Sequence, residues 1–221
     1  MHPRQRNLLL LTSILLMLIL NGLASATAHL GFALKDLYQF FPFAFMPPAW
    51  AFMLSRGLIH SLGIGFFITY CMHHTKNKNS DHFSQDFFPY YISILLLNIA
   101  WIITTTQRLW ILSIIIITAM LITLYLILRK ISKQTGMIKY LGNAARGIYM
   151  GWINIATIVL GVSQVVYSLG YTSISTSFSR MIALSIGVGA VAGISFYQLK
   201  NWYMLGRSVF ALGAAWLAFL G

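Results

Sequence analysis

Residues 88–128 read FPYYISILLLNIAWIITTTQRLWILSIIIITAMLITLYLIL, two long apolar runs separated by Thr106-Gln107-Arg108. A helix needs about 20 mostly apolar residues to cross a hydrocarbon core that is about 30 Å thick. Because that core offers no water to backbone polar groups, runs of this kind form helices there. We therefore expect two membrane-crossing helices, 88–106 and 109–128.

Five further stretches of similar character flank this pair. The seven expected spans are 8–28, 48–71, 88–106, 109–128, 147–168, 179–198 and 202–220. Of the 221 residues, 58% are apolar and 8% are charged, which leaves too little polar surface to cover a soluble globule. The sequence predicts an all-α, polytopic membrane bundle of seven transmembrane helices that form a single membrane domain.

Basic residues give the formal net charge of +12 and cluster at the ends of the expected spans. A cytoplasmic N-terminus puts eleven of them inside and four outside, a bias that predicts this orientation and an outer C-terminus, as in a bacterial inner (plasma) membrane. No basic stripe is interleaved with aromatics in a soluble segment, so we expect no nucleic-acid binding. The inner residues are Arg4, Arg6, Lys76, Lys78, Arg129, Lys130, Lys133, Lys139, Arg146, Lys200 and Arg207; the outer ones are Lys35, Arg56, Arg108 and Arg180.

The first span also has features of a cleavable signal, since Arg4 and Arg6 precede a Leu-rich run that ends at Ala24-Ser25-Ala26. A signal core is usually about 7–15 residues long, and this run is longer. We therefore favour retention of residues 1–26; cleavage would leave six spans.

Acidic residues are confined to Asp36, Asp81 and Asp86, all in expected loops or at span ends. Conventional proton-coupled transporters and pumps carry an ionisable relay inside the bundle, so we do not expect that class. The sequence shows no paired carboxylates, no nucleophile with an evident base and no metal-ligand cluster, so we do not expect an enzyme. The polar segment 73–87, which contains His73, His74 and His82, is interpreted as a solvated loop rather than a metal site.

Neutral polar and indole side chains lie within the expected spans, notably Asn98, Trp101, Trp152 and Asn154. Such groups either join helices through hydrogen bonds or line a polar-edged ligand cavity. A flat apolar molecule with a few polar edges suits aromatic walls with sparse hydrogen-bonding groups. The residues alone leave both readings open.

Three sequence blocks stand in the order of motifs known from one membrane-protein family: PPAWAF at 47–52, LNIAW at 97–101 and GIYMGWINIAT at 147–157. They resemble the tryptophan-rich sensory protein family, the TspO/MBR or peripheral benzodiazepine receptor family, whose helices carry PPxWxF, LNxxW and WxxxAT motifs. The resemblance covers residues 8 to 168, and the last two spans are similar to the longer seven-span branch. It implies a TspO-like five-helix core, 1–168, with two further helices, 169–221, packed on it.

The resemblance also implies an integral membrane ligand-binding protein, a sensor or carrier for tetrapyrroles (porphyrin or haem) or sterol-like lipids. Its partners would be membrane lipid and a hydrophobic planar small molecule, with no required cofactor. The alternatives are an assembly or interaction scaffold without a small ligand, and a membrane enzyme acting on a tetrapyrrole or lipid. Candidate ligand-binding residues are Trp50, Phe52, Arg56, His60, Asn98, Trp101, Trp152, Asn154 and Ala156.

The chain departs from the family at Arg56 and His60, where the family usually has Trp and an aromatic residue four positions later. An i, i+4 spacing puts both residues on one helical face. One interpretation is that Arg56 extends to the outer headgroups while His60 bonds a neighbouring helix. The other is that Arg56 binds an acidic ligand edge, such as a porphyrin propionate, with His60 near the ligand's centre or its second acid group.

Two further features allow more than one interpretation. The aromatic-rich segment 38–52 is either an interfacial belt or the lid of an apolar cavity, and in the family this loop covers the ligand pocket. Ser185, Gly189 and Gly193 form a line of small residues that either packs the extra helices on the core or forms a homodimer seam.

Overall fold

The computed structural model describes most of the first 168 residues and scattered residues after them. The described ranges are 3–26, 49–76, 81–134, 136–168, 185–187, 189–190, 193, 197, 200, 202–206 and 208–209. The expected sixth and seventh spans therefore lie mostly outside the described residues.

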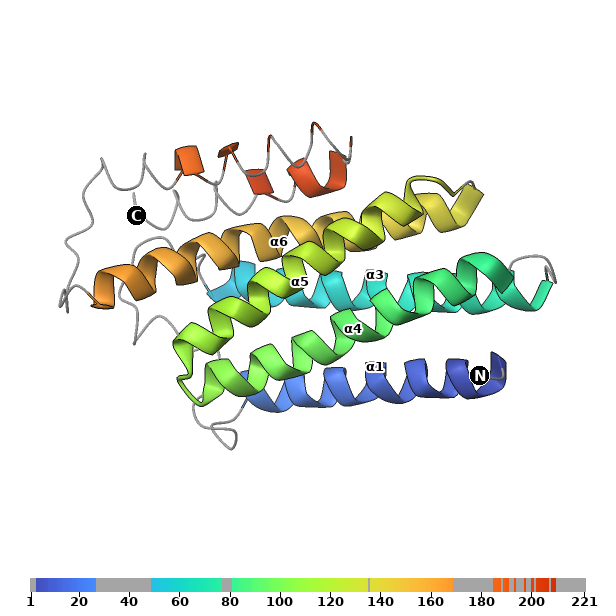
Figure 1. Cartoon of the computed structure of the whole chain (residues 1–221), viewed down its shortest axis with the longest axis horizontal. Coiled ribbons are helices and arrows are strands. Elements are labelled where there is room, and N and C mark those ends of the chain that lie inside the picture. The colour runs from blue at the N-terminus through green and yellow to red at the C-terminus, as the bar shows by residue number, and fades with distance from the viewer. Residues whose placement is uncertain are drawn as a thin grey trace.

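Five long helices make up the described bundle (Figure 1). They are α1 (Pro3–Ala26), α3 (Ala49–Lys76), α4 (Asp81–Thr106), α5 (Trp110–Ile131) and α6 (Gly136–Ser168). No strand occurs within the described ranges. The all-α architecture is therefore confirmed for this part of the chain, and the apolar runs of 88–128 form the α4–α5 hairpin.

A helix-capping motif closes that hairpin. The amide of Leu109 donates to the carbonyl of Thr104 at 2.8 Å, and the amide of Arg108 donates to the carbonyl of Thr105 at 3.1 Å. This pair of bonds is the Schellman pattern, in which the penultimate residue adopts a left-handed conformation. Arg108 is the residue in the left-handed conformation, with a φ of 60°, although it is not a glycine. The chain can therefore reverse within the three residues between α4 and α5.

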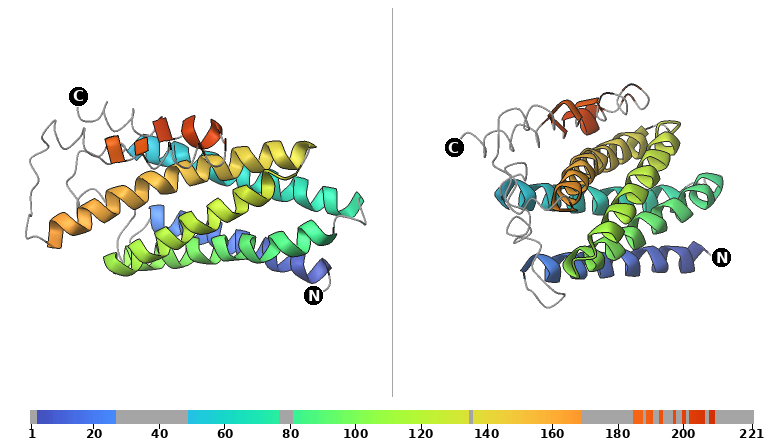
Figure 2. Two further views of the ribbon diagram at one scale, coloured as in Figure 1. Left: turned by 45° about the horizontal axis from the view of Figure 1, so that its top comes forward. Right: turned by 60° about the vertical axis from the view of Figure 1, so that its left-hand side comes forward.

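The helices pack in a defined order (Figures 1 and 2). α5 packs against both α4 and α6, α3 packs against α6, and α1 packs against α4. Among the described helices, α1 and α3 are not a closely packed pair. This arrangement leaves α1 at one edge of the bundle, attached mainly through α4.

The surface of α5 indicates a lipid environment. Its inward face buries residues at three- and four-residue spacing, among them Ile117, Met120 and Leu124. Its outward face is also apolar and includes the exposed Ile111 and Ile115. A helix that is apolar all round is typical of a membrane span, and both Phe87–Thr106 and Trp110–Ile131 are long and apolar enough to cross a membrane. Leu8–Ala24 and Gly57–Thr69 are shorter apolar segments.

The helices match the expected spans at one end and exceed them at the other. For the five spans that the structure describes, each end expected to be outer lies within two residues of the observed helix end. At each end expected to be cytoplasmic, the helix continues beyond the expected span. The interpretation of 73–87 as a loop is wrong for 73–76 and 81–87, which are helical. The largest difference is at α6, which begins at 136 instead of 147, because backbone hydrogen bonding continues where the side chains become polar.

Gly142 sets the position of α6 against its neighbours. A Cβ atom there would lie 2.9 Å from Cε2 of Phe66 and 2.9 Å from Cγ2 of Ile131. Phe66 belongs to α3 and Ile131 ends α5, and both side chains are buried. The missing side chain at Gly142 therefore lets three helices meet at one point.

We predict that Gly142→Ala destabilises the bundle. The new methyl group must displace a buried ring or a buried Ile131 side chain, and overpacking of this kind costs about 1–3 kcal/mol. Thermal unfolding of the purified protein in mild detergent measures the effect. Gly22→Ala on α1 is the control, because a Cβ at Gly22 meets nothing within 4 Å; equal melting temperatures of the two variants would contradict this role of Gly142.

Candidate ligand-binding cavity

A cavity of about 30 Å³ lies among α1, α3, α4 and α6. Apolar side chains from all of these helices contribute to its wall, including Met17, Ile59 and Ile94. Its polar lining comes from His60 on α3, Tyr91 on α4, and Arg146 and Tyr149 on α6. One buried water needs about 10–15 Å³, so the cavity holds a group of two or three heavy atoms and not a whole tetrapyrrole ring.

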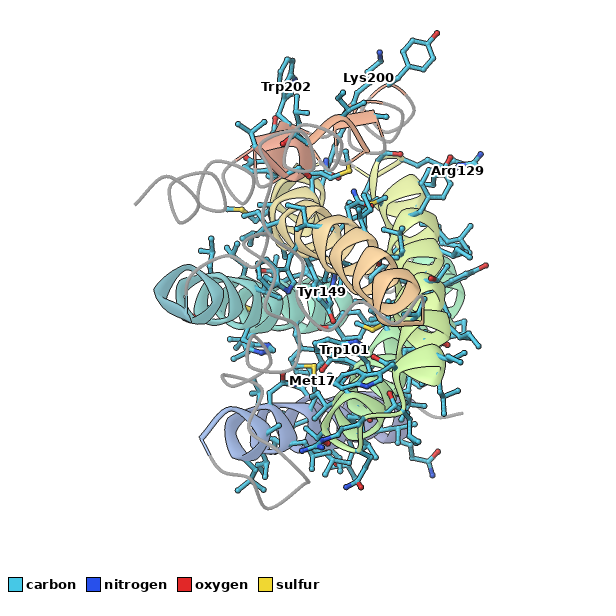
Figure 3. All side chains as sticks on the ribbon, turned by 90° about the vertical axis from the view of Figure 1, so that its left-hand side faces the viewer. Met17, Trp101, Arg129, Tyr149, Lys200 and Trp202 are labelled. Carbon is cyan, nitrogen blue, oxygen red and sulfur yellow. The ribbon has the colours of Figure 1, made fainter. Side chains whose placement is uncertain are left out.

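The cavity reaches the bundle surface beside α3, a helix that packs more closely against α6 than against α1. Ile64 of α3 lines it and is 37% exposed, which places that part of the wall at the bundle surface. In the view of Figure 3, Met17 and Tyr149 lie among the helices, whereas Arg129, Lys200 and Trp202 extend away from them. The opening thus faces outward through the side of the bundle.

Arg146 is the charged residue of the cavity. It is 5% exposed, and its Cζ atom lies 4.4 Å from the ring centroid of Tyr91 and 5.6 Å from that of Phe66. Cation–π contacts of this kind are favourable, more so when water is excluded. They do not satisfy the guanidinium donors, and neither Nε nor Nη2 of Arg146 forms a hydrogen bond with any described residue.

Three aromatic rings support this guanidinium. The centroids of Phe66 and Phe87 are 5.7 Å apart in an edge-to-face arrangement, those of Phe87 and Tyr91 are 5.5 Å apart, and those of Phe66 and Tyr91 are 6.2 Å apart. Such separations fall in the favourable range for aromatic pairs. α3 and α4 thereby present a fixed aromatic surface to the side chain that comes from α6.

A buried chain of hydrogen bonds borders the cavity. Asn21 Nδ2 donates to Asn98 Oδ1 at 2.8 Å, and Asn98 Nδ2 donates to the Tyr149 hydroxyl at 2.6 Å. Asn21 Nδ2 also donates to the Met17 carbonyl at 2.8 Å. Asn98 therefore joins α1, α4 and α6, which confirms that its amide bridges helices.

A second group of buried polar atoms lies beyond this chain of bonds. We use the name indole cluster for Trp101 of α4 and for Trp152 and Asn154 of α6, which are grouped here because all three are buried. α4 and α6 run in the same direction (Figure 1). Trp101 follows Asn98 by three residues on α4, and Trp152 follows Tyr149 by three residues on α6. Both tryptophans therefore lie on the same side of the Asn98–Tyr149 hydrogen bond along the helix axes. Trp101 Nε1 and both amide atoms of Asn154 form no hydrogen bond with described residues.

The candidate residues predicted from sequence fall into three groups in the structure. His60 lines the cavity and Asn98 borders it, whereas Trp101, Trp152 and Asn154 form the indole cluster. Ala156 is half-buried and packs against the core. The side chains of Trp50, Phe52 and Arg56 lie outside the described residues. So do residues 38–48 of the segment 38–52 that was expected to form a lid or belt.

Arg146 is a cavity residue that the sequence pattern did not indicate. It was assigned to the cytoplasmic flank of a span that begins at 147, and the structure places it inside α6. The missed signal is the apolar spacing of Ile138, Ala145, Tyr149 and Trp152, which are all buried on one face. This helical period continues upstream of 147 and predicts that the bundle-facing helix begins before Arg146.

We predict that Asn98→Ala lowers the unfolding free energy by about 1–3 kcal/mol, because it removes two interhelical hydrogen bonds and leaves their partners unpaired. Unfolding in mixed detergent micelles measures the loss. Ser93→Ala is the control, since Ser93 is exposed and bonds only the Pro89 carbonyl of its own helix. In a double-mutant cycle, Asn21→Ala should lower the unfolding free energy less in the Asn98→Ala background than in the wild-type protein. Strictly additive losses of unfolding free energy would contradict the coupling of the two residues.

Comparison with known proteins identifies the family. The chain belongs to the TSPO-like protein family, whose family model matches residues 7–220. The match includes the whole of both expected C-terminal spans, 179–198 and 202–220. No curated protein and no solved structure matches the chain. Family membership, together with the apolar helices, indicates an integral membrane protein of the ligand-binding or sensor kind.

Proposed function

We propose that this chain binds a hydrophobic, planar small molecule of the tetrapyrrole or sterol-like class inside the membrane and acts as its sensor or carrier, without converting it chemically. The N-terminus would be cytoplasmic, in the inner membrane of a bacterium. The observation that carries the proposal is the cavity among α1, α3, α4 and α6, which has polar and apolar lining residues and reaches the bundle surface at Ile64.

The size of the cavity determines how such a ligand would lie. About 30 Å³ accommodates one end group of the molecule, so the larger apolar body would extend between α1 and α3. Separating these two helices disrupts little packing, because α1 is attached mainly through α4 and α3 through α6. Lateral entry from the lipid also suits a ligand that partitions into the membrane.

The indole cluster gives the proposal a second support. Unpaired polar atoms in a low-dielectric interior cost about 1–3 kcal/mol each, and such atoms in a folded protein require an explanation. Trp101 Nε1 and the Asn154 amide would find partners in the polar edges of a flat ligand that reaches this level of the bundle.

We predict that Gly63→Leu abolishes or strongly weakens ligand binding. Gly63 lines the cavity, and a Cβ there meets nothing within 4 Å, so the leucine side chain can occupy the cavity without a backbone clash. Titration of the protein in nanodiscs with protoporphyrin IX and with the fluorescent sterol dehydroergosterol, followed by quenching of tryptophan fluorescence, measures both affinities. We expect a loss of at least about tenfold, equivalent to about 1.4 kcal/mol.

The matched control is Gly57→Leu on the same helix, where a Cβ also meets nothing within 4 Å and the residue is exposed. This variant should bind as the wild-type protein does. If the wild-type protein binds neither probe, the proposed function is wrong; if it binds them and Gly63→Leu binds equally well, the ligand does not use this cavity.

A further inference from the structure

We infer that Arg146 is the binding residue for the carboxylate group of an acidic amphiphile that enters between α1 and α3. This inference rests on the proposed function and narrows it, because it selects ligands with an acid group over neutral ones. The acid group could belong to a tetrapyrrole or to a fatty acid, and the experiment below separates these sources.

The first argument is the state of the guanidinium itself. Arg146 is about nineteen-twentieths buried and lines the cavity, yet its Nε and Nη2 form no hydrogen bond with the described residues. Buried charges in folded proteins are paired, because the free energy needed to remove an ion from water exceeds the stabilisation that contact with an aromatic ring provides. An anion in the cavity would supply the missing pairing.

The second argument is the shape of the available donors. Nε–H and the adjacent N–H of Nη2 point in the same direction along one edge of a guanidinium, and their spacing matches the two oxygens of a carboxylate. Tyr91 and Phe66 contact the group, with ring centroids at 4.4 and 5.6 Å from Cζ. These two centroids are 6.2 Å apart, so both rings approach the guanidinium from neighbouring directions. The rings therefore restrain the guanidinium without pairing its donors, and its Nε–Nη2 edge has no hydrogen-bond partner among the described residues.

The third argument is size. A cavity of about 30 Å³ has room for two or three heavy atoms, which is the size of a carboxylate. The apolar wall from Met17 and Ile59 continues to the half-exposed Ile64, so an apolar body attached to the carboxylate would pass out between the helices. A neutral sterol would leave the guanidinium edge unpaired.

The electrostatic setting favours the same class of ligand. The chain carries fifteen Lys and Arg residues against three Asp and Glu residues. A protein with this imbalance has few internal acids with which to neutralise a buried cation. Its field also attracts anionic amphiphiles from the membrane surface.

The test compares acids with their esters. The full-length protein, in nanodiscs of neutral phosphatidylcholine, is titrated with protoporphyrin IX and its dimethyl ester, and with oleic acid and methyl oleate. We expect the wild-type protein to bind at least one acid about 10- to 100-fold more tightly than the matching ester. Arg146→Gln should lower the affinity for that acid to the level of its ester and leave the affinity for the ester unchanged.

Arg129→Gln is the control, because it removes an exposed positive charge from the end of α5 outside the cavity, and it should keep the preference for the acid. The acid should also raise the melting temperature of the wild-type protein and not that of Arg146→Gln. If Arg146→Gln does not fold, Arg146→Lys replaces it; lysine keeps the charge without the two-nitrogen edge, so the preference should fall to an intermediate value.

Each result has a defined meaning. Equal binding of acids and esters by the wild-type protein, or an unchanged preference in the Arg146 variant, overturns the inference and leaves the proposed function standing if the porphyrin ester or dehydroergosterol binds. If oleic acid alone shows the preference that depends on Arg146, the carboxylate site stands and the proposed ligand class is wrong. Absence of binding by every probe overturns both.

Discussion

The close approach of α6 to α3 and α5 at Gly142 is the constraint on which the described site depends. Phe66 and Ile131 occupy the space that a side chain at Gly142 would fill, so α6 lies near enough to α3 for the next turn to contact the same ring. That turn carries Arg146, whose guanidinium then lies over Phe66 and Tyr91. A single missing methyl group therefore positions the one charged residue that lines the cavity.

The sequence predicted the membrane part of the fold because hydropathy detects the same property that a bilayer selects. The expected ends at 106 and 168 coincide with the observed ends of α4 and α6. The ends expected to be cytoplasmic were predicted less well, most clearly at Gly136. Hydropathy reports where the hydrocarbon ends, whereas a helix ends where its backbone hydrogen bonds end, and polar residues next to a span can remain helical.

The site was predictable only in part, because an arginine at the position of Arg146 can have either of two roles. An arginine next to an apolar run is commonly a topology signal, and Arg146 was interpreted in that way. Its burial depends on contacts with Phe66 and Tyr91, which lie at least 55 positions away in the sequence (146 − 91 = 55). Asn98 was easier to recognise, since an amide in a membrane span needs a partner, but only the structure identifies Asn21 and Tyr149 as those partners.

A buried cation whose Nε and Nη2 have no hydrogen-bond partner among the described residues also connects ligand binding to the stability of the bundle. The unpaired edge of Arg146 lowers the stability of the ligand-free state, and an acid in the cavity would remove that penalty. By linkage, a ligand present at 100 times its Kd stabilises the bound fold by about 2.7 kcal/mol. Because the proposed entrance lies between α1 and α3, the ligand would contact α1 directly, and the Asn21–Asn98 bond ties α1 to the rest of the bundle. Occupancy of the cavity would in this way alter the packing of an edge helix, which is the type of change that a membrane sensor must produce.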